Sequence, residues 1–201
     1  MWQADAPRPQ LRGAMSDDGY LPGQLLIAMP TMGDSRFQRT VIYMCAHSAQ
    51  GAMGLVINKV LDNITFPDLL EQLGIEESTL EQRIQVHFGG PVEQTRGFVL
   101  HSSDYIQDSS LVIDETIALT ASLDVLKAIA SGQGPRHSIL ALGYAGWGPG
   151  QLDAEIQANG WLHAPADLRL IFERDLERKW QAAVASVGVD LSLLSGEFGH
   201  A

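Results

Sequence analysis

The sequence predicts an α+β fold, with a mixed, largely antiparallel sheet or a partly open barrel flanked by helices. The 201-residue length suits one well-filled core, so we expect a single domain. The apolar runs are short and rich in β-branched residues, which is typical of strands. Three strand-like runs precede the first helical pattern and three more precede the second, unlike the strict alternation of a doubly wound sheet.

The first part of the chain is polar, proline-rich and aperiodic. We expect residues 1–20 to form a flexible N-terminal tail, with Met15 as an alternative start of translation, and residues 21–201 to form the α+β domain. The domain is predicted to open with strands at 24–29, 40–47 and 53–58.

A first helix is predicted at residues 66–73, where apolar side chains recur at helical spacing. Thr65 is a candidate N-cap, Pro67 suits the first turn, and Gly74 can end the helix in a left-handed conformation. These signals define both ends of the helix.

A second group of strands is predicted at 84–88, 97–101 and 111–113. A helix at 121–130 with Ser122 as its cap follows them. The remaining chain is predicted to contain a strand at 138–142, a glycine-rich loop at 143–150, a helix at 151–158, extended segments at 161–162 and 168–172, and a helix at 175–187 that Gly188 ends.

Composition excludes several classes of protein. The net charge of −11 disfavours nucleic-acid binding, because an acidic surface repels polyanions, and no basic recognition helix is present. No apolar run approaches the roughly 18 residues of a membrane span, and no signal peptide is evident. Cys45 is the one cysteine, so a disulfide within the chain is impossible, which fits a reducing cytoplasm.

The glycine-rich segment 143–150 is the most distinctive motif. Its backbone N–H groups could face an anion at the start of the next helix, or Tyr144 and Trp147 could form a stacking platform beside Gly146. Alternatively, the glycines serve a tight turn whose aromatic side chains cover the core. The segment matches neither the dinucleotide fingerprint nor a P-loop, so no cofactor is predicted.

A second glycine-rich connection, Gly89-Gly90, allows a sharp or bulged path between two strands. Arg96 and His101 follow it and could bind an anion or a carboxylate. The alternative is that Arg96 forms a surface ion pair and that His101 is a structural polar residue at a strand end.

Cys45 and His47 are predicted to share one strand face, which suggests a nucleophile and its base. Side chains two residues apart on a regular strand are ~7 Å apart, however, which is too far for a direct hydrogen bond. The apolar neighbours of Cys45 favour a core thiol. The histidines lack zinc-site spacing, so no catalytic residue and no metal ligand is predicted.

Several ordered motifs together resemble the YqgE/AlgH family of uncharacterised bacterial proteins. The residues that carry the resemblance are Gly23-Gln24-Leu25-Leu26-Ile27-Ala28-Met29-Pro30, Asp34, Phe37, His47, Gly51-Ala52-Met53-Gly54-Leu55-Val56-Ile57-Asn58, Gly89-Gly90-Pro91-Val92, Arg96-Gly97-Phe98-Val99-Leu100-His101, Gly143-Tyr144-Ala145-Gly146-Trp147, Gly150-Gln151-Leu152, Glu155 and Trp161-Leu162. The resemblance implies an α+β domain of the bacterial cytoplasm. It also brings the label of transcriptional regulator, against which the acidic charge argues.

Two functional hypotheses remain open. The first is a non-enzymatic regulatory or interaction domain with an unknown protein or small-molecule partner. The second is a small-molecule-binding protein or an enzyme with a pocket at the two glycine-rich connections. The candidate surface for either function comprises Arg96, His101, Tyr144, Trp147, Gly89, Gly90 and Gly146.

Overall fold

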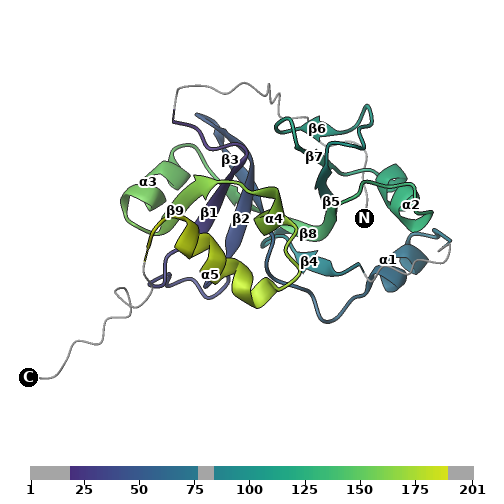
Figure 1. Ribbon diagram of the computed structural model, residues 1–201, viewed down its shortest axis with the longest axis horizontal. Coiled ribbons are helices and arrows are strands. Elements are labelled where there is room, and N and C mark those ends of the chain that lie inside the picture. Colours follow the sequence, from purple (N-terminus) through teal and green to yellow (C-terminus); the bar gives the residue numbers. More distant parts are fainter. Residues whose placement is uncertain (1–18, 77–83, 190–201) are drawn as a thin grey trace, which may run out of the picture.

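The structure, a computed structural model, describes residues 19–76 and 84–189 (Figure 1). Its strands are β1 (Gln24–Ala28), β2 (Val41–Ser48), β3 (Gly51–Val56), β4 (Val86–Phe88), β5 (Val92–Ser102), β6 (Leu111–Val112), β7 (Ile117–Thr120), β8 (Ser138–Trp147) and β9 (Trp161–Pro165). Its helices are α1 (Phe66–Gln72), α2 (Leu123–Ala130), α3 (Gln151–Gln157), α4 (Leu168–Ile171) and α5 (Leu176–Ser186).

The nine strands form one curled sheet in the order β6-β7-β5-β8-β3-β2-β1-β9, with β4 lying beside β8. Every pairing of named strands is antiparallel except the parallel pair β4–β8. Helices α1 and α2 lie at the β4–β5 end, whereas α3, α4 and α5 lie around β1, β2 and β9 (Figure 1). The predicted α+β fold with a largely antiparallel sheet is confirmed.

Strand β8 joins the two halves of the sheet. Its first part pairs with β5 and β4, and Ala141 is opposite both Phe98 and His87. Its last part pairs with β3, where Trp147 is opposite Ala52. The prediction of a loop at 143–150 was therefore wrong for residues 143–147, because the ladders with the neighbouring strands extend through these glycines.

Alternation along the strands divides the core between the two faces of the sheet. On β1, Leu25 and Ile27 pack in a cluster with Trp180 and Val184 of α5. Leu26 and Ala28, which point to the other face of β1, pack in a second cluster with Leu152 of α3. A third cluster joins α1 and α2 to the opposite end of the sheet.

The predicted helix ends are largely confirmed. Thr65 caps α1 in a capping box with Asp68, and Gly74 follows the helix with a φ of 66°. Ser122 lies at the N-cap of α2, but its hydroxyl donates to Gln107 Oε1 rather than accepting from the helix backbone. The expected apolar face of α5 is buried, and Trp180 is only 5% exposed.

Residues 168–172 were predicted to be extended, but Leu168–Ile171 forms the short helix α4. Asp167 caps it, because its side-chain oxygen accepts a hydrogen bond from the backbone N–H of Arg169 at 2.8 Å. The segment is too short to show a helical period, so the cap was the available signal.

One hydrogen bond connects distant parts of the curled sheet. The hydroxyl of Tyr43 on β2 donates to Oδ2 of Asp114, which lies between β6 and β7, at 2.9 Å. Asp114 also accepts from the backbone N–H groups of Thr116 and Ile117. The contact therefore brings the β6–β7 edge across the core cluster to β2.

No helix among residues 19–76 and 84–189 is long and apolar enough to cross a membrane.

Candidate functional site

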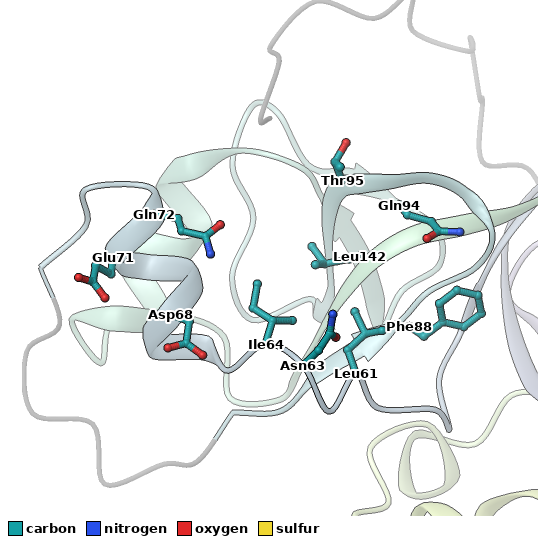
Figure 2. A pocket seen from close by; sticks show the side chains of 10 residues that line it. All are labelled: Leu61, Asn63, Ile64, Asp68, Glu71, Gln72, Phe88, Gln94, Thr95 and Leu142. Carbon is teal, nitrogen blue, oxygen red and sulfur yellow. The ribbon is translucent and has the colours of Figure 1, made fainter.

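A cavity of about 600 Å³ lies between α1 and the neighbouring strands β4, β5 and β8 (Figure 2). This volume falls within the range of small-molecule sites. The residues that line it are Leu61, Asn63, Ile64, Asp68, Glu71, Gln72, Phe88, Gln94, Thr95 and Leu142. We treat this cavity as the candidate functional site.

Between its polar walls, the cavity has a floor of apolar residues together with the polar Asn63. Leu61, Ile64, Phe88 and Leu142 supply its apolar surface. Asp68, Glu71 and Gln72 come from α1, on one side of Figure 2. Gln94 and Thr95 come from β5, on the other side. Such a lining can hold a molecule with an apolar stem and polar ends.

The α1 wall is positioned by the capping box. Oδ2 of Asp68 accepts hydrogen bonds from the Thr65 backbone N–H at 2.9 Å and from the Thr65 hydroxyl at 2.6 Å. The side-chain hydrogen bond, followed by the backbone one, lowers the pKa of Asp68 below its ordinary value. Asp68 is therefore ionised at neutral pH.

The sheet side of the cavity is fixed by backbone hydrogen bonds of β4. The N–H of Phe88 donates to the carbonyl of Lys59 at 2.9 Å, and that of Leu61 donates to Val86 at 2.8 Å. The N–H of Gly89 donates to the carbonyl of Leu142, also at 2.8 Å. Phe88 and Leu142 are thereby held next to each other on the cavity floor.

The two glycine-rich connections meet directly beside this floor. A Cβ on Gly143 would lie 2.4 Å from the carbonyl oxygen of Gly90, and a Cβ on Gly89 would lie 2.2 Å from that of Gly143. A Cβ on Gly90 would lie 2.0 Å from the backbone of Tyr144. These glycines are therefore needed for a close approach of two backbones.

Three of the predicted surface residues come together around Phe98. The guanidinium of Arg96 lies 5.1 Å from the centre of the Phe98 ring, and its Nη1 donates to Oε2 of Glu93 at 3.2 Å. The Tyr144 ring contacts the Phe98 ring edge to face. A Cβ on Gly146 would lie 3.1 Å from the Tyr144 ring.

The other two side chains lie elsewhere. His101 is fully buried, with Nε2 2.8 Å from Oγ1 of Thr120 and Nδ1 3.0 Å from the carbonyl of Ser102. Burial lowers its pKa, and its hydrogen bond to Ser102 and the charge of Asp104 partly oppose this shift. Trp147 is buried in the cluster under α3. The structure thus does not gather Arg96, His101, Tyr144 and Trp147 into one pocket.

Glu155 explains why Trp147 lies in the core. Its Oε2 accepts hydrogen bonds from the indole N–H groups of both Trp147 and Trp161, each at 2.9 Å. The two rings meet edge to face with centroids 6.0 Å apart. Trp147 therefore covers the core. This agrees with the alternative interpretation of the segment 143–150, in which its aromatic side chains cover the core instead of forming a stacking platform.

Cys45 and His47 do not share a face, contrary to the sequence prediction. Cys45 is the extra residue of a β-bulge between the pairs Met44–Gly54 and Ala46–Met53, and the bulge reverses the alternation beyond it. Cys45 packs in the cluster with α5, and burial raises the pKa of its thiol to about 12. His47 instead lies 3.7 Å from Asp153 of α3.

Lys179 and His87 form a buried basic pair on the other side of β4. Nζ of Lys179, which is 1% exposed, donates to the carbonyls of Ile57 at 2.9 Å and Ile171 at 2.7 Å. Burial lowers the pKa of Lys179 to about 8. Burial, together with the Lys179 charge, lowers the pKa of His87 to about 4. Lys179 satisfies the final carbonyl of α4, which is a structural role.

Sequence reasoning missed the cavity residues because half of them are ordinary polar residues of a helix surface and a strand end, and the others are mostly ordinary apolar residues. It did identify the glycine connections that adjoin the cavity. In the described part of the chain, no group of three or more His, Cys, Asp and Glu side chains is arranged to hold a metal ion.

Comparisons with known proteins match nearly the whole chain. A family model described as "DUF179: AlgH-like" matches residues 25–192. A UPF0301 protein of Bradyrhizobium diazoefficiens is 57% identical over 194 residues, which cover 92% of this chain and 91% of that protein. A UPF0301 protein of Rhodospirillum rubrum is 56% identical over 184 residues, covering 92% of this chain and 96% of the relative.

Solved structures share the fold. The solution structure of the AlgH protein from Pseudomonas aeruginosa is similar, with a TM-score of 0.74 and 46% sequence identity, over 94% of this chain and all of that one. A crystal structure of a Corynebacterium diphtheriae protein matches with a TM-score of 0.59 at 23% identity, over 74% of this chain and 78% of that one. This second likeness concerns the fold alone.

Proposed function

The chain belongs to the AlgH-like family, and from this premise we propose that it is a non-enzymatic regulatory domain that binds a small polar molecule in the cavity beside α1. The observation that carries the proposal is the cavity itself, with its largely apolar floor and its hydrogen-bonding walls. Binding there could change the surface that the domain presents to a partner protein.

The chemistry of the lining favours binding over catalysis. The described lining contains amides, carboxylates, one hydroxyl and apolar groups, but no cysteine, histidine or lysine. The thiol of Cys45 is buried, and its raised pKa keeps it protonated at neutral pH. An enzyme that uses the Asp68 and Glu71 carboxylates is the alternative, and conversion of a bound molecule would identify it.

Internal charge pairing supports the view that the domain does not bind DNA directly. Five basic side chains of the described residues form ion pairs with carboxylates, at Arg36, Arg96, Lys127, Arg136 and Arg178. Lys179 is buried. Such a surface offers few unpaired cationic side chains to the phosphate groups of DNA. We propose that the protein is located in the cytoplasm.

A thermal-shift screen with metabolites tests the proposal. A ligand of the cavity should raise the midpoint of unfolding in a concentration-dependent way, because it binds the native state. Thr95→Trp should abolish the shift by filling the cavity from the exposed end of β5. Val112→Trp, at an exposed position of β6, is the matched control and should leave the shift intact.

Two results would contradict the proposed function. One is that no metabolite raises the midpoint. The other is a shift that persists in Thr95→Trp, which would place the ligand outside the cavity. Product analysis of each hit distinguishes binding from turnover.

A further inference from the structure

We propose that Ser110 is a nucleophilic serine that accepts an acyl group from an activated ester or thioester, with His101 as the base that receives its proton through Thr120. The observation that carries the proposal is a chain of hydrogen bonds that joins these three side chains in one direction. None of them lines the cavity beside α1, so this second site is independent of the proposed function.

The direction of the chain is set at His101. Its Nδ1 lies 3.0 Å from the carbonyl oxygen of Ser102, which can only accept, so Nδ1 carries a hydrogen. In the neutral imidazole the other nitrogen, Nε2, is then an acceptor. Nε2 lies 2.8 Å from Oγ1 of Thr120, and the Thr120 hydroxyl therefore donates to it.

Ser110 is the donor at the other end of the chain. Because the one hydroxyl hydrogen of Thr120 is directed to His101, Oγ1 of Thr120 is the acceptor in its 2.7 Å contact with Oγ of Ser110. The Ser110 oxygen itself accepts from the backbone N–H of Gln107 at 3.0 Å. A hydroxyl oxygen has two lone pairs, so one lone pair of Ser110 remains for attack on an acyl carbon.

The surroundings of His101 keep its imidazole neutral. Burial lowers its pKa below 6.5, and the hydrogen bond to Ser102 and the charge of Asp104 oppose this shift only in part. The ring of Tyr105 meets the imidazole edge to face, with centroids 5.9 Å apart. Asp104 and Tyr105 are thus the titratable groups that act on His101 among the described residues. At pH 7 the imidazole is able to accept a proton.

A tight turn presents the serine. The N–H of Ser110 donates to the carbonyl of Gln107 at 2.9 Å, which closes a four-residue turn directly before β6. Ser110 is only partly buried, whereas Thr120 and His101 are both 0% exposed. The nucleophile therefore lies at the surface end of the chain of hydrogen bonds and the base at its buried end.

The reaction follows from this order. The Ser110 oxygen forms a bond to the acyl carbon, while the bond from that carbon to the leaving oxygen or sulfur breaks. The Ser110 proton moves to Thr120 as the Thr120 proton moves to Nε2 of His101. His101 then returns a proton by the reverse path to water. The products are the acyl-serine, the anion of the leaving group and one proton.

p-Nitrophenyl acetate tests the proposal on the full-length protein. Peptide mass spectrometry should find an acetyl group on Ser110, and Ser110→Ala should abolish it. Ser109→Ala is the matched control, because it removes an exposed hydroxyl from the same turn and should leave the acetylation of Ser110 unchanged.

The role of Thr120 is tested by two substitutions. Thr120→Val removes the hydroxyl but keeps the branched side chain, and it should slow the acetylation of Ser110 about a hundredfold, because the serine loses its base. Thr120→Ser keeps the hydroxyl and should retain most of the rate. Circular dichroism checks that both variants are folded.

The pH profile of the unaltered chain gives a readout that does not depend on the folding of any variant. The rate of Ser110 acetylation should rise as His101 loses its proton, at a pH below 6.5, and should level off at neutral pH. A serine without a base would instead react in proportion to the hydroxide concentration, with no plateau.

Three results would overturn the proposal. They are the absence of an acetyl group on Ser110, an equal rate in folded Thr120→Val, and a rate that follows hydroxide through neutral pH. The cavity beside α1 is tested separately by Thr95→Trp, so either proposal can fail without the other.

Discussion

At the scale of single residues, Glu155 stabilises the two tryptophans that cover the core under α3. Its replacement by Ala would leave the indole N–H groups of Trp147 and Trp161 without their acceptor. Glu155→Ala should therefore lower the free energy of unfolding by about 2–3 kcal/mol. Urea denaturation followed by tryptophan fluorescence measures this change.

The matched control is Glu177→Ala on α5, an exposed position that should change stability by less than about 0.5 kcal/mol. If Glu155→Ala lowers the free energy of unfolding no more than this control does, water replaces the carboxylate as the acceptor for both indole N–H groups.

His87 makes stability depend on pH. Its folded pKa is about 4, against 6.5 for the free side chain, mainly because of burial and then because of the Lys179 charge. The unfolded chain thus binds more protons between these values, so stability is lost as pH falls from 6.5 to 4. The loss from this residue is on the order of 3 kcal/mol.

His87→Gln should flatten the pH dependence of unfolding over this range. Burial also lowers the pKa values of His47 and His101, so these residues act in the same direction and the slope should decrease rather than vanish. An unchanged slope in His87→Gln would contradict the assignment.

At the scale of secondary structure elements, the close approach of residues 90–94 to β8 depends on glycine. Gly143 and Gly132 both have a φ of 74°, but only Gly143 has backbone atoms within reach of an added Cβ. Gly132→Ala should cost about 1 kcal/mol, from backbone conformation alone. Gly143→Ala should cost at least about 3 kcal/mol, because two packed strands must separate.

Thermal or urea unfolding of both variants gives the comparison. Similar losses of stability would mean that residues 90–94 move away from β8 without a cost in free energy. In that event, the stability loss in Gly143→Ala would come only from the left-handed backbone conformation of this residue.

Local signals predicted most elements, and the errors have clear causes. Thr65 and Gly74 defined α1 because capping is determined by neighbours in the chain. The segment 143–147 was assigned to a loop because its glycines are weak strand formers. In the structure, pairing with β3 and β5 extends β8 through it, as at Val92–Tyr144.

At the scale of the whole molecule, the Tyr43–Asp114 hydrogen bond links β2 to the β6–β7 edge of the curled sheet. Tyr43→Phe removes this bond and leaves the ring packing in place. It should lower the free energy of unfolding by about 1–2 kcal/mol while unfolding remains a single transition.

Tyr20→Phe is the control, and it should have an effect close to zero. Calorimetry measures the transition midpoint in both variants. Equal midpoints would show that the hydroxyl contact adds nothing to packing.

The sequence by itself determined the α+β class, the family resemblance, the acidic charge and most helix ends. These properties depend on composition and on residues close together in the chain. It also indicated the two glycine connections, and Arg96, Tyr144 and Gly146 do lie together.

Only the tertiary structure decided which side chains meet. One extra residue at Cys45 reversed the faces of β2, and burial removed His101 and Trp147 from the surface. The cavity combines α1 with β4, β5 and β8, which are distant in the sequence. Its polar residues carry no local signal, because a cavity is a property of packing between elements rather than of any one segment.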